Sequence, residues 1–273
     1  MAGRPLHVAN VATTLAEKAI QGLLLFPQDD ETRIEQSRHP FVGLVDHIAV
    51  MSLAEGDIGH VFPSTIHSNT PHGITAEYIG NQLKETGVDV HFYGNACLDG
   101  MSLADVRRQR TNFFHSGGLE ADKTSQTQQR NLKGVATIGA PPTFVENFNI
   151  RLTDKCNQDM ARSLTKALRE RDGGLLGVEG LTLPYSNNRY EIACNLLQPD
   201  VGSAEAIMER TQDWAQKQLQ SSPFQHMEDL VEIGYRVGTT SEQCLRVLSL
   251  SSEGLEEHDN HVVARLKGFL GLS

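Results

Sequence analysis

Long apolar runs are missing from this sequence. No window approaches the ~18 consecutive apolar residues that a membrane-spanning helix needs. The first residues show no basic stretch followed by an apolar stretch and a small-residue cleavage site. We therefore expect no membrane span and no secretory signal. The four cysteines are far apart, without a C-x-x-C pair, which argues against zinc and favours a reducing, cytoplasmic location.

Clusters of Lys and Arg are also missing. Proteins that bind nucleic acid need such clusters to neutralise phosphates, and the formal net charge here is −10. We therefore expect no nucleic-acid partner. The same charge repels anionic ligands at long range, so local arginines and backbone N–H groups would have to hold an anionic substrate.

The residues that are present describe a globular protein. Of the 273 residues, 39% are hydrophobic and 21% are charged, which allows one large domain or two small ones. Apolar periodicity and capping signals predict helices and strands in the first half. These are a helix over 8–24, a strand over 42–53, a helix over 71–85, a strand over 88–92, a helix over 102–110 and an exposed loop over 116–133.

The second half has a more regular pattern. Strands are predicted over 148–152, 175–183, 189–197 and 230–237, and helices over 156–168 and 204–215. The order β-α-β-β-α-β is that of the ferredoxin-like unit. The first half does not complete such a unit, because it begins with a helix whose broad apolar face needs a sheet to cover. Either its fold is unusual or the chain lacks its natural beginning.

Several segments, in order along most of the chain, resemble the formiminotransferase family. They match its H-P-R-x-G-x-x-D, L-Y-G-x-A, G-A-T-x-T-G-A…F-N-I-N and G-G-L…V-x-x-N-L-L segments, and none is diagnostic alone. The matching segments are 39–46 (HPFVGLVD), 92–96 (FYGNA), 134–140 (GVATIGA) with 148–150 (FNI), and 173–175 (GGL) with 192–197 (IACNLL).

The resemblance implies an α/β (α+β) fold of two ferredoxin-like subdomains, the first lacking its N-terminal strands. We place these subdomains at 1–144 and 145–273. It implies transfer of a formimino group from N-formiminoglutamate to tetrahydrofolate, which serves as co-substrate without a metal, in one-carbon metabolism and histidine catabolism. The family positions that carry over are His39, the general base, and Gly134, a folate contact. A homodimer is left open.

Histidine suits this reaction chemically. N5 of tetrahydrofolate loses a proton as it attacks the formimino carbon, and the leaving glutamate nitrogen then gains one. A group whose ordinary pKa is ~6.5 can perform both transfers at neutral pH. His39 is therefore the catalytic candidate.

Three departures from the family pattern keep other interpretations open. No segment matches the family's opening strand and its hairpin, whose aspartate supports the histidine. The arginine after H-P is Phe41, and in the folate-contacting segment, here 125–134, only Gly134 plainly matches. The alternatives are a catalytically inactive folate-binding or regulatory homologue, and a module that uses the ferredoxin-like fold only to dimerise.

Other conspicuous residues favour structural roles. His39 and His47 lie roughly 26 Å apart along an extended chain, too far to share a metal ion. We interpret His258 and His261 as part of a solvated polar turn, Cys97 as a buried structural thiol, and Trp214 as a core residue. No metal site is predicted.

Overall fold

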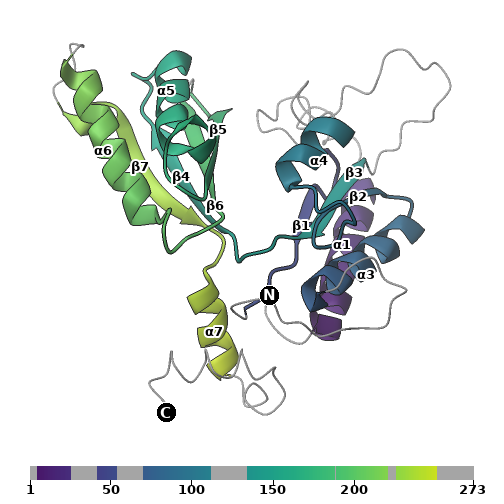
Figure 1. Ribbon diagram of the computed structural model, residues 1–273. Helices are drawn as coiled ribbons and strands as arrows, with labels where there is room; N and C mark the ends of the chain where they lie inside the picture. The colour runs from purple at the N-terminus through teal and green to yellow at the C-terminus, as the bar shows by residue number, and fades with distance from the viewer. Residues whose placement is uncertain are drawn as a thin grey trace, which may run out of the picture. The chain divides into compact units, whose positions relative to one another are not determined.

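The chain forms two compact units in the computed structural model (Figure 1), which describes residues 5–25, 42–53, 70–111, 134–187, 189–220 and 226–250. The first unit comprises Met1–Pro142 and Cys244–Ser273, and the second comprises Thr143–Gln243. Each unit has its own sheet and its own hydrophobic core. The predicted α/β class is confirmed.

The first unit is built on a three-stranded parallel sheet with the order β1-β3-β2. Its elements are α1 (Pro5–Leu25), β1 (His47–Ala49), α3 (Pro71–Glu85), β2 (Asp89–Gly94), α4 (Leu103–Arg110) and β3 (Val135–Ala140). The predicted helices and the strand at 88–92 are confirmed. Ser102 caps α4 as expected, because its Oγ accepts the Asp105 N–H at 3.1 Å. The predicted loop over 116–133 lies outside the described residues.

The two faces of this sheet differ in polarity. Val90, Phe92 and Ile138 belong to the core against α3, and α1 packs in turn on α3. Helix α3 lies close to β2: a Cβ at Gly80 would lie only 2.3 Å from the Phe92 ring. Strand alternation places His47 and Tyr93 on the opposite face. That face carries the polar groups.

The predicted strand over 42–53 is wrong over most of its length, since β1 spans only His47–Ala49. The Val42 N–H donates to the side chain of Asp46, four residues later, at 2.7 Å. An extended strand cannot bring these two residues together. Gly43 instead forms an isolated antiparallel bridge with Gly134.

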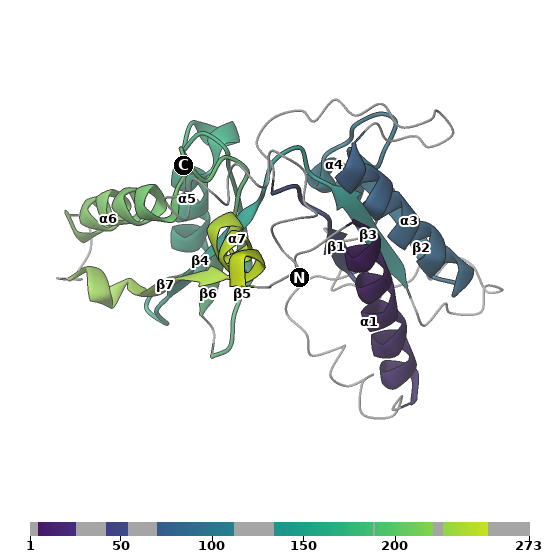
Figure 2. The same ribbon diagram turned by 90° about the horizontal axis from the view of Figure 1, so that it is seen from below.

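The second unit is a four-stranded antiparallel sheet with the order β5-β6-β4-β7, the ferredoxin-like arrangement that the sequence predicts. Helices α5 and α6 lie on the same side of this sheet (Figure 2). Its elements are β4 (Glu146–Leu152), α5 (Gln158–Leu168), η1 (Glu170–Asp172), β5 (Val178–Pro184), β6 (Tyr190–Leu196), α6 (Ala204–Gln220), η2 (Met227–Asp229) and β7 (Val231–Val237).

Alternation along β4 divides this sheet into a buried face and an open face. Ile150 and Leu152 are fully buried in the core with α5 and α6, whereas Asn149 and Arg151 are only partly buried. Trp214 is 5% exposed, as predicted, and its Nε1–H donates to Ser163 at 2.8 Å. The polar side chains of the strands therefore gather on the open face.

A last helix, α7 (Ser241–Leu250), follows β7, and its residues from Cys244 onward belong to the first unit. Leu245 and Leu248 are buried there, with Leu53 packed against them. Within the described ranges, no helix combines the length and apolarity that crossing a bilayer requires.

Candidate functional site

Gly134 lies immediately before β3, with a φ of +68°. A Cβ at this position would lie 2.6 Å from both the Gly43 Cα and the Val42 carbonyl oxygen. Only glycine tolerates this combination of left-handed backbone and close approach. His39 lies outside the described residues. Gly134 is therefore the predicted site residue whose surroundings can be described.

The backbone that faces Gly134 is held from two sides. The Val42 C=O accepts the Val135 N–H at 2.9 Å, and the Val42 N–H donates to Asp46 Oδ1 at 2.7 Å. The second carboxylate oxygen, Asp46 Oδ2, accepts from Arg107 Nη2 at 2.6 Å. The Arg107 side chain is only 14% exposed. Both oxygens of Asp46 are thus occupied by charge-assisted or backbone hydrogen bonds.

Arg107 comes from α4, and its burial has an electrostatic consequence. Desolvation lowers the pKa of the guanidinium, while the Asp46 carboxylate opposes that shift. The ion pair therefore offsets the cost of burying the cation. The arginine is engaged with the protein and is poorly placed to bind a substrate directly.

His47 and Tyr93 form a second polar contact on the same face of the sheet. The His47 Nε2 and the Tyr93 hydroxyl oxygen are 2.8 Å apart. The Tyr93 ring lies against Gly139, where a Cβ would be 2.4 Å from its Cδ1. The absence of a side chain at Gly139 thus lets the ring extend across β3 toward β1.

Both partners of this contact are neutral at physiological pH. His47 is exposed as a whole residue, yet desolvation of its ring beside Tyr93 and then the charge of Arg107 lower its pKa to about 3. Burial raises the pKa of Tyr93 well above its ordinary value, against the opposing effect of Arg107. The hydrogen bond therefore joins a neutral imidazole to a neutral phenol.

A third polar contact lies where β2 ends. The Asn95 side-chain amide is 3.0 Å from His72 Nε2, in the first turn of α3. The Asn95 N–H donates to Ala140 at the end of β3, at 2.7 Å. The carboxyl ends of parallel strands are common ligand positions in α/β folds. This edge thus brings an amide and an imidazole together.

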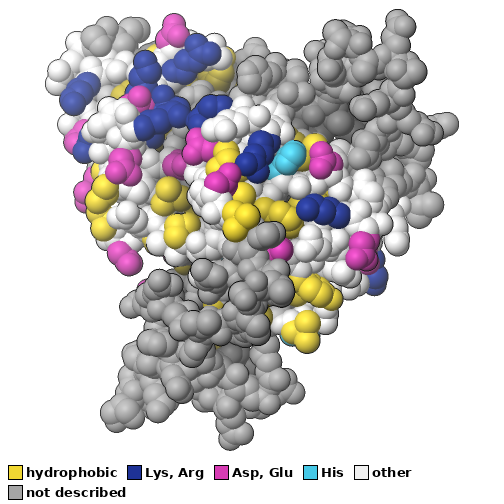
Figure 3. Space-filling view, turned by 45° about the vertical axis from the view of Figure 1, so that its right-hand side comes forward, with side chains coloured by type: hydrophobic (Ala, Val, Ile, Leu, Met, Phe, Trp, Pro, Cys, Tyr) yellow, Lys and Arg dark blue, Asp and Glu magenta, His cyan; other side chains and the backbone are white. Residues whose placement is uncertain are grey.

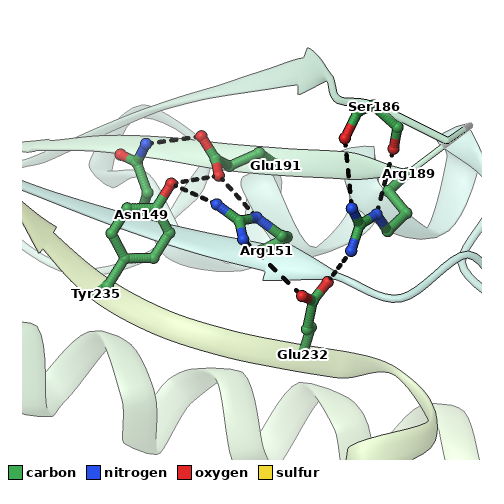
Figure 4. A network of polar contacts seen from close by, with 7 residues as sticks. All are labelled: Asn149, Arg151, Ser186, Arg189, Glu191, Glu232 and Tyr235. Carbon is green, nitrogen blue, oxygen red and sulfur yellow. Dashed lines mark hydrogen bonds and ion pairs between the residues drawn. The ribbon is translucent and has the colours of Figure 1, made fainter.

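The open face of the second unit carries a larger network (Figure 4). Tyr235 donates to Glu191 at 2.6 Å and accepts from Arg151 at 3.1 Å. Arg151 Nε also lies 3.5 Å from Glu191, and its Nη1 lies 3.8 Å from Glu232. Arg189 pairs with Glu232. Two arginines thus balance two glutamates.

Neighbouring side chains complete this network. The Arg151 guanidinium lies 4.2 Å from the Tyr185 ring centroid, within cation–π range. The Asn149 amide donates to Glu191 at 2.8 Å. Burial and then the bond to Glu191 raise the pKa of Tyr235. Hydrogen bonds and ion pairs thus link these side chains across the open face of the sheet.

Basic side chains gather over the second unit, in the upper left of Figure 3. The exposed basic residues of this unit are Lys155, Arg162, Lys166, Arg171, Lys217 and Arg236. They stand out on a chain whose formal net charge is −10. Two of them are paired with carboxylates, Lys155 with Asp229 and Arg236 with Glu146.

Sequence reasoning missed the polar cluster of the first unit. Asp46 stands in the family-like segment 39–46 but received no role, and His47 was considered only as a metal ligand. Arg107 gave no signal, because it meets Asp46 across 61 positions of sequence. Cys97 is partly exposed and donates to Asp99 at 2.8 Å, so its expected burial is wrong.

The sequence predicts no metal site and places His258 and His261 in a solvated polar turn. His258 and His261 lie outside the described residues. Among the described residues, no group of three or more His, Cys, Asp or Glu side chains could hold a metal ion.

Comparisons with known proteins complete the description of the site. No protein-family model matches the chain. The chain is 28% identical over 181 residues to a formiminotransferase cyclodeaminase-like protein of Arabidopsis thaliana. The match covers 61% of this chain and 57% of the plant protein, so the chain spans less than two thirds of that relative. The chain is thus similar to a formiminotransferase-type protein, the family that its motifs resemble.

Proposed function

We propose that the protein is a folate-dependent transferase that moves a formimino group from N-formiminoglutamate to tetrahydrofolate. The observation that carries this proposal is the 28% identity to the formiminotransferase cyclodeaminase-like protein. The ferredoxin-like second unit and the motif segments along both units support it. In this proposal the two subdomains are residues 1–144 and 145–273.

His39 is the proposed general base. It removes the N5 proton of tetrahydrofolate as that nitrogen attacks the formimino carbon. It then returns a proton to the departing glutamate nitrogen, so the proton balance closes within one turnover. An imidazole with an ordinary pKa can carry out both steps near neutral pH.

Gly134 is the proposed folate contact. Its backbone is left-handed, and the space that a Cβ would occupy is filled by Val42 and Gly43. What supports the proposed contact is the match of this glycine to the family's folate-contacting segment.

The proposal is tested with the full chain, as wild type and as His39→Ala. Calorimetric titration with tetrahydrofolate should show saturable binding by both proteins. Transfer from N-formiminoglutamate should occur with the wild type and fall by roughly 10²–10⁴-fold in His39→Ala, the usual contribution of a general base. Absence of tetrahydrofolate binding by the folded wild type would contradict the proposal.

The replacement of the family arginine by Phe41 favours a second candidate, a folate-binding homologue without turnover. An apolar ring cannot supply the positive charge of a guanidinium beside anionic substrates. Saturable binding of tetrahydrofolate without transfer in the wild type would select this candidate. Transfer that depends on His39 would exclude it.

A further inference from the structure

We propose that Asp46 and Arg107 are positioning residues for the folate contact at Gly134, acting through the backbone of 42–43. This inference rests on the proposed function. Neither side chain needs to touch the ligand, because each would act on the chain that faces Gly134. The argument follows the contacts outward from Gly134 to α4.

The first step is the direct contact between Gly134 and 42–43. Gly43 forms the isolated bridge with Gly134, and the Val42 carbonyl accepts the Val135 N–H at 2.9 Å. The space beside Gly134 is already filled on that side, since an added Cβ would meet Val42 and Gly43 at 2.6 Å. The position of 42–43 therefore sets how much of Gly134 remains free for a ligand.

The second step is the attachment of Val42 to Asp46. The Val42 N–H donates to Asp46 Oδ1 at 2.7 Å, which closes a tight bend between these residues. The Asp46 carbonyl accepts both the N–H and the hydroxyl of Thr137, at 3.0 and 2.9 Å. Asp46 is thus fixed to β3 by its main chain and holds Val42 with its side chain.

The third step is the orientation of the Asp46 carboxylate. Arg107 binds Oδ2 at 2.6 Å and is itself largely buried. With Oδ2 held, Oδ1 stays directed at the Val42 N–H. The contacts therefore run from α4 through Asp46 to the backbone beside Gly134.

Stability alone gives little reason for such a pair. A partly buried ion pair contributes about as much as an apolar pair of similar size would, because desolvation offsets the attraction. Its specific benefit is a fixed orientation of both partners. A positioning role therefore explains the arrangement better than a stabilising one.

The test compares four variants with the wild type. Asp46→Ala removes both contacts of the carboxylate, and Arg107→Met removes only the ion pair. Asp46→Asn keeps an oxygen for the Val42 N–H while losing the charge. Arg108→Met is the matched control, because Arg108 lies on the same helix in an exposed pair with Asp105.

Tetrahydrofolate titration of the full chain and amide hydrogen exchange supply the two readouts. Asp46→Ala should weaken binding about tenfold, because it removes the hydrogen bond that holds Val42 together with the ion pair. Arg107→Met should weaken binding by a few-fold, and Asp46→Asn less than Asp46→Ala. Exchange at the amides of Val42 and Val135 should quicken in parallel, whereas exchange at Ile79 and Leu83 in α3 should not change. Arg108→Met should match the wild type.

Several outcomes would overturn the inference. If the wild type binds tetrahydrofolate and both Asp46→Ala and Arg107→Met bind it equally well, the positioning role is contradicted. The proposed function is not affected by that result. Faster exchange at Val42 and Val135 without weaker binding also contradicts the positioning role. No binding by the wild type contradicts the proposed function, and this inference with it. If Asp46→Ala does not fold, the binding and exchange of Arg107→Met and Asp46→Asn still test the positioning role.

Discussion

The two units bury their sheets in different ways. The first has three parallel strands with polar contacts on one face, next to the largely buried Arg107 of α4. The second has four antiparallel strands, with helices on one face and balanced charges on the other. The comparison indicates that charged groups in the second unit pair with each other on its open face, whereas Asp46 and Arg107 in the first hold the backbone beside Gly134.

The largest effect should come from cavities in the two separate cores. Ile138 in the first unit and Ile150 in the second are both fully buried. Each Ile→Ala change should cost about 2–5 kcal/mol. Native-state hydrogen exchange should show lost protection mainly in the unit that carries the substitution. Equal loss across both units would contradict the division into two cores.

The polar network of the second unit gives the next largest effect. Arg151→Met leaves Glu191, whose side chain is 9% exposed, without its cation. We expect a loss of about 2–3 kcal/mol, less than for a fully buried pair because Arg151 is partly exposed. Arg189→Met is the control, since its partner Glu232 is 38% exposed, and should cost about 1 kcal/mol or less. Urea unfolding measures both, and equal losses would contradict the predicted ranking.

Acid should weaken the first unit through His47. Its pKa is lowered from 6.5 to about 3 in the folded protein. As the pH falls, the unfolded chain therefore takes up this proton at a higher pH than the folded chain. The contribution of neutral His47 to the free energy of unfolding is complete above pH 6.5 and declines as the pH falls toward 3. His47→Gln removes this titration. Urea unfolding at several pH values should show a shallower acid loss in the variant, and identical pH profiles would contradict the assignment.

The smallest effect concerns thiol reactivity. Cys97 in the first unit is partly exposed, whereas Cys156 and Cys194 in the second unit and Cys244 in α7 are buried. Burial raises the pKa of Cys156 to about 11 and that of Cys194 to about 12. Burial and then the bond to Asp99 also raise the pKa of the Cys97 thiol, so the order of labelling follows from exposure. A disulfide reagent should label Cys97 first and the others only on unfolding. Cys97→Ser should remove the early phase, and its persistence would contradict this order.

The second unit could be predicted from the sequence almost element by element. Strand β4 alternates strictly, as at 147–152, because one face meets helices and the other faces away from them. The apolar run over 42–53 gave no such guide in the first unit. Most of it is not a strand, because Asp46 bends the chain back onto Val42.

The candidate site was less predictable than the fold. Gly134 could be found because a family motif contains it. The contacts of Arg107 with Asp46 and of Tyr93 with His47 join residues 61 and 46 positions apart. Local patterns carry no information on such pairs, since only the packing of α4 and the strands brings them together.

Titration of the full chain with tetrahydrofolate, in the wild type and two glycine variants, tests the central claim most directly. Gly134→Ala and Gly173→Ala both place a side chain on left-handed backbone, with φ of +68° and +84°, but only the Gly134 Cβ would meet other atoms. The account predicts saturable binding by the wild type and Gly173→Ala, and weaker binding by Gly134→Ala. No binding by the folded wild type, or equal binding by both variants, would contradict it.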